Sequence, residues 1–308
     1  MRVAGIRQIG GPVETLDVAD ARAPGDDEVL IDVVAAGVGN WDEFARTGGW
    51  DVGRVPPMAL GVEAAGVVAA VGHAVGDWKV ADHVLTHPLP LRDQGSWAPQ
   101  LLAPAALLAR KPQAISWNAA AAFAVPALTA EQVVAEALDA QAGEPLLVNG
   151  AGGVTGALIV SLAAMRGASV IATASPSNHE RLRRLGASHL IDYHDVRWPE
   201  RVRELTGGNG VASAANAVPG GAAEAIRMVR DGGRLATITS DPPDEKRGIR
   251  VSSVYVRPDG AQLRKLVALL AAGTLEVQVG SAFHLDDAAA ALAAAVHGRG
   301  GGAVVLML

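Results

Sequence analysis

The 308-residue chain contains no cysteine. Disulfide bonds, cysteine-ligated zinc, iron–sulfur clusters and thiol catalysis are therefore excluded. An excess of positive charge is also lacking, because 26 Lys and Arg residues stand against 32 Asp and Glu, for a net charge of -6. Without a basic stripe to displace the counterions of phosphate groups, we expect no nucleic-acid partner.

Long apolar runs and a signal-peptide core are absent as well. No stretch of about 18 apolar residues is free of charged residues and glycine, so the sequence predicts no membrane span and no membrane partner. The first residues, MRVAGIRQIGG, lack the apolar segment of a secretory signal. We therefore expect a cytoplasmic protein. Half of the residues are hydrophobic, and the length suffices for two globular domains.

The most informative feature that is present is a glycine-dense turn within PLLVNGAGGVTGALIVSLAAMRGASVIATA, at 145–174. An apolar strand at 146–148 enters the turn, an apolar helix follows at about 155–166, and a second strand covers 169–173. Glycine lets the backbone approach a pyrophosphate, and a helix N-terminus offers free N–H groups and partial positive charge. A plain turn needs fewer glycines, which are entropically costly, so the segment predicts a dinucleotide site. The turn contains Gly150, Gly152, Gly153 and Gly156.

The end of the second strand indicates which dinucleotide binds. An NAD site usually carries Asp or Glu there, which accepts a hydrogen bond from the ribose 2′-hydroxyl. Here the chain reads ASPSNHER from position 174, and its first acid is Glu180, already inside the next helix. The side chains of Ser175, Asn178 and Arg181 suit a 2′-phosphate, so we expect NADP(H). Ser177 and Glu180 also match a helix capping box, which gives Ser177 a structural alternative.

Strand and helix patterns divide the chain into two regions. Residues 1–118 read as short strands separated by glycine and proline, which indicates a mostly β domain. From residue 145 onward, apolar strands alternate with helices, which predicts a parallel sheet with helices on both faces. The expected fold class is α/β, with a doubly wound parallel sheet beside the mostly β domain.

Several motifs occur in a fixed order: AGVGNWD at 36–42, LGVEAAGVV at 60–68, VPALTA at 125–130 and DGGRL at 231–235. Together they resemble the medium-chain dehydrogenase/reductase superfamily, and most of all its zinc-independent quinone oxidoreductase branch. The resemblance spans nearly the whole chain. It implies a GroES-like catalytic domain, formed by 1–118 and 274–308, and a Rossmann NADP(H)-binding domain at 119–273.

The same resemblance implies that no catalytic metal is bound. The zinc enzymes of the superfamily carry Cys and His ligands where this chain has Gly39 and Val62. Without a Lewis acid, we expect hydride transfer to an acceptor that is already activated, namely a quinone or another conjugated carbonyl. His83 and His87 lie too far apart along a predicted strand to form a metal pair, so we expect them to be surface or loop histidines.

Further site residues follow from the resemblance. Asn40 and Arg46 match an Asn…Arg-x-Gly signature and are expected to position the reactants. Phe44 replaces a tyrosine, and Trp41 and Trp50 flank the expected substrate mouth, where they can stack on a flat acceptor or simply pack. The glycine loop is aligned with Thr155 in the place of the last family glycine. The expected cofactor-binding residues are Asn40, Thr129, Gly150, Gly152, Gly153, Val154, Thr155, Ser175, Asn178, Arg181, Tyr193, Ile238 and Thr239.

The sequence thus predicts an NADPH-dependent reductase whose substrate lies in a cleft between the domains, and a homodimer paired through 249–256. Two alternatives stay open. One is an enoyl or enone reductase of a biosynthetic pathway. The other is a non-catalytic NADPH-binding scaffold or sensor, because Phe44 replaces the family tyrosine and Asn178 stands where a lysine often binds the 2′-phosphate.

Overall fold

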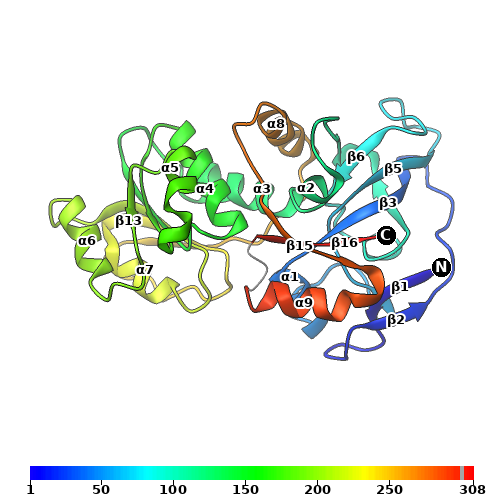
Figure 1. Cartoon of the computed structure of the whole chain (residues 1–308), viewed down its shortest axis with the longest axis horizontal. Helices are drawn as coiled ribbons and strands as arrows, with labels where there is room; N and C mark the ends of the chain where they lie inside the picture. Colours follow the sequence, from blue (N-terminus) through cyan, green and yellow to red (C-terminus); the bar gives the residue numbers. More distant parts are fainter. Residues whose placement is uncertain (299–301) are drawn as a thin grey trace. The chain divides into compact units, whose positions relative to one another are not determined.

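A computed structural model describes residues 1–298 and 302–308, and it divides the chain into two compact units (Figure 1). The first unit comprises Met1–Val125 with Arg257–Leu308, and the second comprises Pro126–Val256. Among the described residues, every helix is too short or too polar to span a bilayer.

The division differs from the expected domain boundaries mainly in the placement of α8 (Gly260–Ala271), which we expected in the Rossmann domain. This helix contacts β8 (Leu108–Arg110) of the first unit. Arg264 on α8 donates hydrogen bonds to the carbonyl oxygens of Ala106 at 3.1 Å and Leu108 at 3.0 Å. Within the expected tail segment, residues 299–301 lie outside the described residues.

The first unit contains two mainly antiparallel sheets, as its short strands between glycine and proline turns predict. The long strand β3 (Glu28–Val38) is central, since β5, β7 and β16 all pair with it. The larger sheet has the order β15-β16-β3-β5-β6-β8, and the smaller has the order β2-β1-β4. The other strands are β1 (Arg2–Ile6), β2 (Glu14–Asp17), β4 (Met58–Ala59), β5 (Ala64–Val71), β6 (His83–Thr86), β7 (Gln100–Pro104), β15 (Val279–His284) and β16 (Ala303–Met307).

The helix α1 (Asn40–Thr47) is a feature that the sequence patterns did not predict. The N–H of Gly39 donates to the Asp42 carboxylate at 2.9 Å, and Gly48 ends the helix in a left-handed conformation with φ 80°. Acids in its first turn and Arg46 in its last turn complement the helix dipole, a signal that was available in the sequence. Besides α1 and α8, the unit contains α2 (Trp117–Ala121) and α9 (Ala288–Val296).

The second unit contains one sheet of six parallel strands in the order β11-β10-β9-β12-β13-β14. This is the 3-2-1-4-5-6 order of dinucleotide-binding domains, so the expected doubly wound fold is confirmed. Its core consists of the apolar faces of these strands, including Leu147, Ile171 and Leu235. The strands are β9 (Pro145–Asn149), β10 (Ser169–Thr173), β11 (His189–Ile191), β12 (Val211–Asn216), β13 (Val229–Thr237) and β14 (Arg250–Ser253).

Helices cover both faces of this sheet (Figure 1). Because parallel strands are joined by right-handed crossovers, α4 (Val154–Met165) and α5 (His179–Arg184) lie on one face. The helices α6 (Trp198–Leu205) and α7 (Ala222–Met228) lie on the other. The chain enters the unit through α3 (Ala124–Glu131), which continues into a π-helical turn, Gln132–Ala137.

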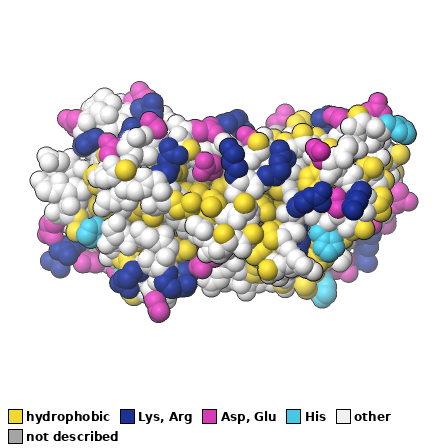
Figure 2. Space-filling model, turned by 90° about the horizontal axis from the view of Figure 1, so that it is seen from above, with side chains coloured by type: hydrophobic (Ala, Val, Ile, Leu, Met, Phe, Trp, Pro, Cys, Tyr) yellow, Lys and Arg dark blue, Asp and Glu magenta, His cyan; other side chains and the backbone are white. Residues whose placement is uncertain are grey.

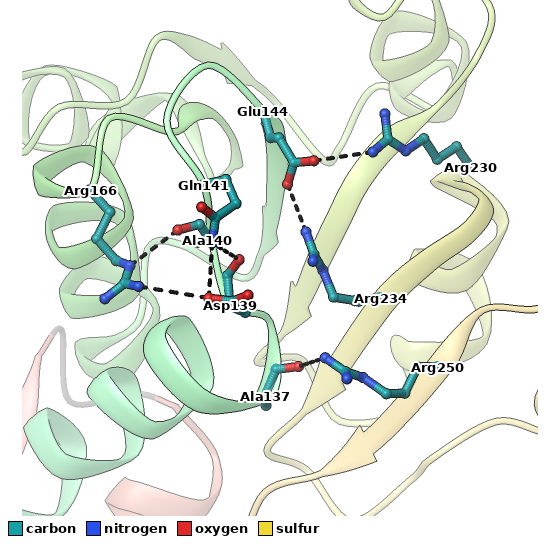
Figure 3. A network of polar contacts seen from close by, with 9 residues as sticks. All are labelled: Ala137, Asp139, Ala140, Gln141, Glu144, Arg166, Arg230, Arg234 and Arg250. Carbon is teal, nitrogen blue, oxygen red and sulfur yellow. Dashed lines mark hydrogen bonds and ion pairs between the residues drawn. The ribbon is translucent and has the colours of Figure 1, made fainter.

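A polar network fastens the amino ends of these strands (Figure 3). Glu144, just before β9, accepts hydrogen bonds from Arg230 at 3.1 Å and Arg234 at 2.6 Å, both on β13. Arg250 on β14 donates to the carbonyl of Ala137 at 3.0 Å. Ligands of parallel α/β sheets bind at the opposite, carboxyl edge, so we interpret this network as structural.

We expect Glu144→Gln to lower the free energy of unfolding by about 1 kcal/mol, because two arginines lose a shared, partly buried carboxylate. Urea denaturation measures the change. The matched control is Glu204→Gln on α6, since Glu204 is exposed and pairs only with Arg201 of the same helix among the contacts described. Equal effects of the two substitutions would contradict the structural importance of the Glu144 network.

Candidate functional site

The glycine turn between β9 and α4 is shaped by two glycines. Gly150 has φ 86°, and a Cβ there would lie 2.6 Å from the Val218 side chain. A Cβ on Gly156 would lie 2.2 Å from the carbonyl oxygen of Gly150, so only glycine permits the helix to pack this closely against the turn. Gly156 is therefore the last glycine of the motif, and the alignment that put Thr155 in its place is wrong.

The N-terminus of α4 offers backbone N–H groups to an anion. Gly153 is the residue before the helix, and no side chain caps it. A Cβ on Gly153 would meet nothing nearer than the Gly150 carbonyl oxygen, at 3.7 Å, so the space above the turn is open. The N–H groups of the first turn, which begins with Val154 and Thr155, lack partners within the helix and can bind a pyrophosphate.

A cluster of hydroxyl and amide groups follows β10, where an NAD site usually carries an acid. The hydroxyls of Ser175 and Ser177 lie 3.0 Å apart, and the amide of Asn178 donates to Ser175 at 3.0 Å. The guanidinium of Arg181 donates to the carbonyl oxygen of Gly152 at 2.8 Å, which ties this cluster to the glycine turn. Ser177 lies inside the 3₁₀ turn Pro176–Asn178, and no side chain caps α5, so the capping-box interpretation is wrong.

The remaining expected cofactor residues of this unit are dispersed around the sheet. Tyr193 follows β11, is half exposed and stacks on His194 with a centroid distance of 4.2 Å. Ile238 and Thr239 follow β13, at the carboxyl edge of the sheet. Thr129 is buried within α3. The cofactor roles of these four residues stay predictions.

In the first unit, α1 brings four of the expected residues together. Asn40 is exposed at the start of the helix, Trp41 follows it, and Phe44 is 38% exposed. Arg46 forms a two-bonded pair with Glu43 and donates to the carbonyl oxygens of Gly10 and Gly11. Arg46 therefore braces the β1–β2 turn against α1, which fits a positioning role better than direct contact with a ligand. Trp50 follows α1 with its ring 6.2 Å from that of His87.

Two buried carboxyl groups, one on α1 and one directly before β5, were not predicted from the sequence. Asp42 and Glu63 are 0% and 1% exposed, and each has one oxygen without a hydrogen-bond partner among the described residues. The other oxygen of Glu63 accepts from the N–H of Val125 at 2.8 Å. Burial raises the pKa of Asp42 to about 8, against hydrogen bonds from the Gly39 and Gly61 backbone. Burial, and then the charge of Asp42, raise the pKa of Glu63 well above its ordinary value.

His87 is another buried polar residue. It lies in the loop that follows β6, one of the two positions expected for it, but it is not at the surface. It is 1% exposed, and burial lowers its pKa to about 4. Its Nδ1 lies 2.7 Å from the Val62 carbonyl oxygen, which can only accept, so the proton is on Nδ1 and Nε2 carries a lone pair. No group of three potential metal-ligating side chains occurs within residues 1–298 and 302–308.

The face drawn in Figure 2 carries charges of both signs in close proximity. Such charges form ion pairs in several places, as Arg110 does with Asp82 at 3.1 Å and Arg247 with Asp231 at 3.0 Å. Local pairing lowers the positive potential that would attract a polyanion.

We expect the stability of the protein to depend on pH through Asp42. Its folded-state pKa lies above the ordinary 3.8, so its stabilising effect is complete below that value and is lost as pH rises towards 8. The unfolding free energy of the Asp42→Asn variant should therefore fall less than that of the wild type between about pH 5 and about pH 8. At the upper pH the variant should be the more stable protein. Urea denaturation across this range tests it, with the exposed Asp17→Asn as control. Parallel pH profiles for all three proteins would refute the assignment.

Family models match both halves of the chain. Residues 25–113 match the alcohol dehydrogenase GroES-like domain, and residues 185–306 match the zinc-binding dehydrogenase domain. The first segment lies within the first unit, and the second runs from the later part of the parallel sheet into the tail.

Curated relatives are similar over different extents. The mouse synaptic vesicle membrane protein VAT-1 homolog is 34% identical over 60% of this chain and 45% of its own length. Erythronolide synthase EryA2 of Saccharopolyspora erythraea is 35% identical over 91% of this chain and 8% of its own length. The chain therefore spans less than half of these two relatives. Human quinone oxidoreductase is 26% identical over 100% of this chain and 98% of its own length.

Solved structures share the complete fold. An NAD-dependent alcohol dehydrogenase aligns with a TM-score of 0.89 at 28% identity, covering 100% of both chains. A quinone oxidoreductase of Pseudomonas syringae pv. tomato aligns with a TM-score of 0.88 at 26% identity, covering 100% of this chain and 99% of that chain. A mycobacterial protein described as complexed with NADPH aligns with a TM-score of 0.86 at 26% identity, covering 100% of both chains. With its GroES-like and dehydrogenase segments in this order, the chain belongs to the medium-chain dehydrogenase/reductase superfamily and is similar to its quinone oxidoreductases.

Proposed function

We propose that this protein is an NADPH-dependent reductase that transfers hydride to a quinone or another conjugated carbonyl, as a cytoplasmic homodimer and without zinc. One observation carries the proposal. An uncapped helix N-terminus follows a glycine turn, and beside it the end of β10 presents hydroxyl and amide groups in place of an acid. The turn suits a pyrophosphate, and the neighbouring groups suit a 2′-phosphate.

The choice of NADP(H) rests on the side chains after β10. A carboxylate at Ser175 would accept from a ribose hydroxyl but would repel a phosphate, whereas hydroxyls and amides donate to it. Arg181 adds a positive charge beside the same cluster. Among the structural neighbours, one is described with NADPH and another is named NAD-dependent, so the comparisons leave the choice to these residues.

The choice of acceptor rests on the chemistry of the first unit. Gly39 and Val62 have no side-chain atoms that could ligate a metal, so a simple alcohol or ketone would lack polarisation by a Lewis acid. A bound nicotinamide supplies the hydride. A conjugated acceptor spreads the arriving charge onto its own oxygen, and Asn40 with the aromatic side chains of α1 would then hold the reactants in position.

The homodimer is proposed through β14, which is an edge strand of the six-stranded sheet. Its outer N–H and C=O groups form a template for pairing with a second copy. The strand covers Arg250–Ser253 and is shorter than the expected 249–256, so that Tyr255 lies beyond it.

An enoyl or enone reductase is the second candidate function. It is favoured by the similarity over 91% of this chain to a segment of erythronolide synthase EryA2. Both candidates use the same cofactor and the same metal-free chemistry, so kcat/KM for a quinone and for an enone separates them. Cofactor binding without turnover of either acceptor would instead favour the scaffold or sensor.

We expect NADPH to raise the melting temperature more than NADH does. A ligand at about 100 times its Kd stabilises the folded state by about 2.7 kcal/mol, which a thermal-shift assay detects. Ser175→Ala should raise the Kd of NADPH about tenfold, because one hydrogen bond to a charged phosphate is lost. The Kd of NADH should stay unchanged. Ser188→Ala, an exposed change before β11, is the control. Equal stabilisation of the wild type by both nucleotides would exclude the 2′-phosphate role of the cluster.

Two alanine substitutions in the glycine turn should have opposite effects. Gly156→Ala forces a Cβ against backbone and should lower the unfolding free energy of the ligand-free protein by at least about 2 kcal/mol. Gly153→Ala has room for its methyl group, so it should fold normally but lose stabilisation by NADPH, because the methyl occupies the pyrophosphate approach. Urea denaturation and thermal shift together measure both. Normal NADPH binding by Gly153→Ala would argue against this turn as the pyrophosphate site.

A further inference from the structure

A continuous chain of hydrogen bonds crosses the carboxyl edge of the six-stranded sheet. The N–H of Gly150 donates to the hydroxyl of Thr173 at 3.1 Å, and that hydroxyl donates to the Asn149 carbonyl oxygen at 2.9 Å. The amide nitrogen of Asn149 donates to the side-chain oxygen of Asn216, also at 2.9 Å. All three side chains are buried, and they come from the ends of β10, β9 and β12.

The chain continues to a carboxylate. The two protons of the Asn216 amide have three acceptors within reach: the hydroxyls of Thr237 at 3.2 Å and Thr239 at 3.0 Å, and the Val218 carbonyl oxygen at 3.0 Å. These hydroxyls donate to one oxygen of Asp241, at 2.8 Å and 2.5 Å. The other oxygen accepts from the N–H of Ala222 at 3.4 Å. Burial raises the pKa of Asp241, but the hydrogen bonds from Thr239, Thr237 and Ala222 outweigh it, so its pKa lies below the ordinary value and the group is ionised.

The groups at the two ends of this chain have fixed hydrogen-bonding roles. A backbone N–H can only donate, and an ionised carboxylate can only accept. The Thr239 hydroxyl has two weaker acceptors within reach, the Thr237 hydroxyl at 3.0 Å and the Val218 carbonyl at 3.5 Å. The charged oxygen of Asp241 is both nearer and stronger, so it takes the proton. One lone pair of Thr239 accepts from the Asn216 amide, and the other is left to accept.

The position of Thr239 within the fold indicates what it could accept. The strand order reverses between β9 and β12, and a dinucleotide binds across such a point with one nucleotide over each half of the sheet. The glycine turn and the Ser175 cluster belong to the β9–β10 half, which takes the adenosine 2′-phosphate in the proposed function. The β12–β13 half is left for the nicotinamide nucleoside. Thr239 follows β13 and is partly exposed there.

We propose that Asp241 is a positioning residue that holds the Thr239 hydroxyl as an acceptor for the carboxamide N–H of the nicotinamide. The proposal rests on the proposed function, since it assumes that NADP(H) binds. Thr239 is already an expected cofactor residue, but nothing in the sequence ITSD at 238–241 marks Asp241 as part of a ligand site. An amide in place of Asp241 would donate to one threonine and so turn its hydroxyl away from the ligand.

The test compares Kd values of three probes: NADP⁺, its 3-acetylpyridine analogue, which lacks the amide N–H, and adenosine 2′,5′-bisphosphate, which lacks the nicotinamide. The wild type should bind NADP⁺ about tenfold more tightly than the acetylpyridine analogue. Asp241→Asn and Thr239→Val should each abolish this preference, and the double variant should show no further loss. Adenosine 2′,5′-bisphosphate should bind all of these proteins equally. Glu144→Gln, at the opposite edge of the sheet, should keep the preference.

The outcomes separate this proposal from the proposed function. If Asp241→Asn raised the Kd of NADP⁺ and of its acetylpyridine analogue by the same factor, the role of Asp241 would be structural only. The inference would then be overturned, while the proposed binding of the cofactor would stand. If the wild type bound neither NADP⁺ nor adenosine 2′,5′-bisphosphate, the proposed function would fail and this inference with it.

Discussion

The hydrogen bond between the amides of Asn149 and Asn216 is the interaction on which the rest of the dinucleotide half depends. It joins the ends of β9 and β12, the two strands between which the order of the sheet reverses. Strands at such a point diverge in their connections, and the crevice they leave is where ligands bind. Two buried amides at this point require partners, since an unsatisfied one costs about 1–3 kcal/mol. The bond therefore holds the floor of the site and orients the groups attached to it.

The two edges of the same sheet have different chemistry. At the amino edge, Glu144 and the arginines of β13 form partly exposed ion pairs that fasten strands together. At the carboxyl edge, neutral hydroxyls and amides lead to one carboxylate and leave backbone N–H groups of α4 open. Ion pairs tolerate water and loose geometry, whereas a ligand site needs donors and acceptors held in one orientation. This difference between the two edges arises because all of the parallel strands begin at one edge and end at the other.

The first unit contains two buried carboxyl groups close in sequence to Gly39 and Val62. Gly39 and Val62 have no side-chain atoms that could ligate a metal, whereas the nearby residues Asp42 and Glu63 have buried carboxyl groups. Each uses one oxygen for a backbone N–H, at Gly39 and at Val125. Their raised pKa values follow from burial. Asp42 accepts from the backbone N–H that precedes α1, the helix that carries Asn40, whereas Glu63 accepts from the backbone of α3.

The sequence alone determined the doubly wound sheet, the glycine turn and the hydroxyl-rich end of β10, because strand periodicity, glycine spacing and the lack of an acid are local in the chain. It missed α1, the burial of His87 and the Asp42–Glu63 pair, and it placed the last glycine of the turn one residue early. Those features depend on neighbours distant in sequence, such as the Gly150 carbonyl oxygen over Gly156 and the Val62 carbonyl beside His87. Only the tertiary structure decided them, since burial and hydrogen-bond partners exist only once separate strands are packed together.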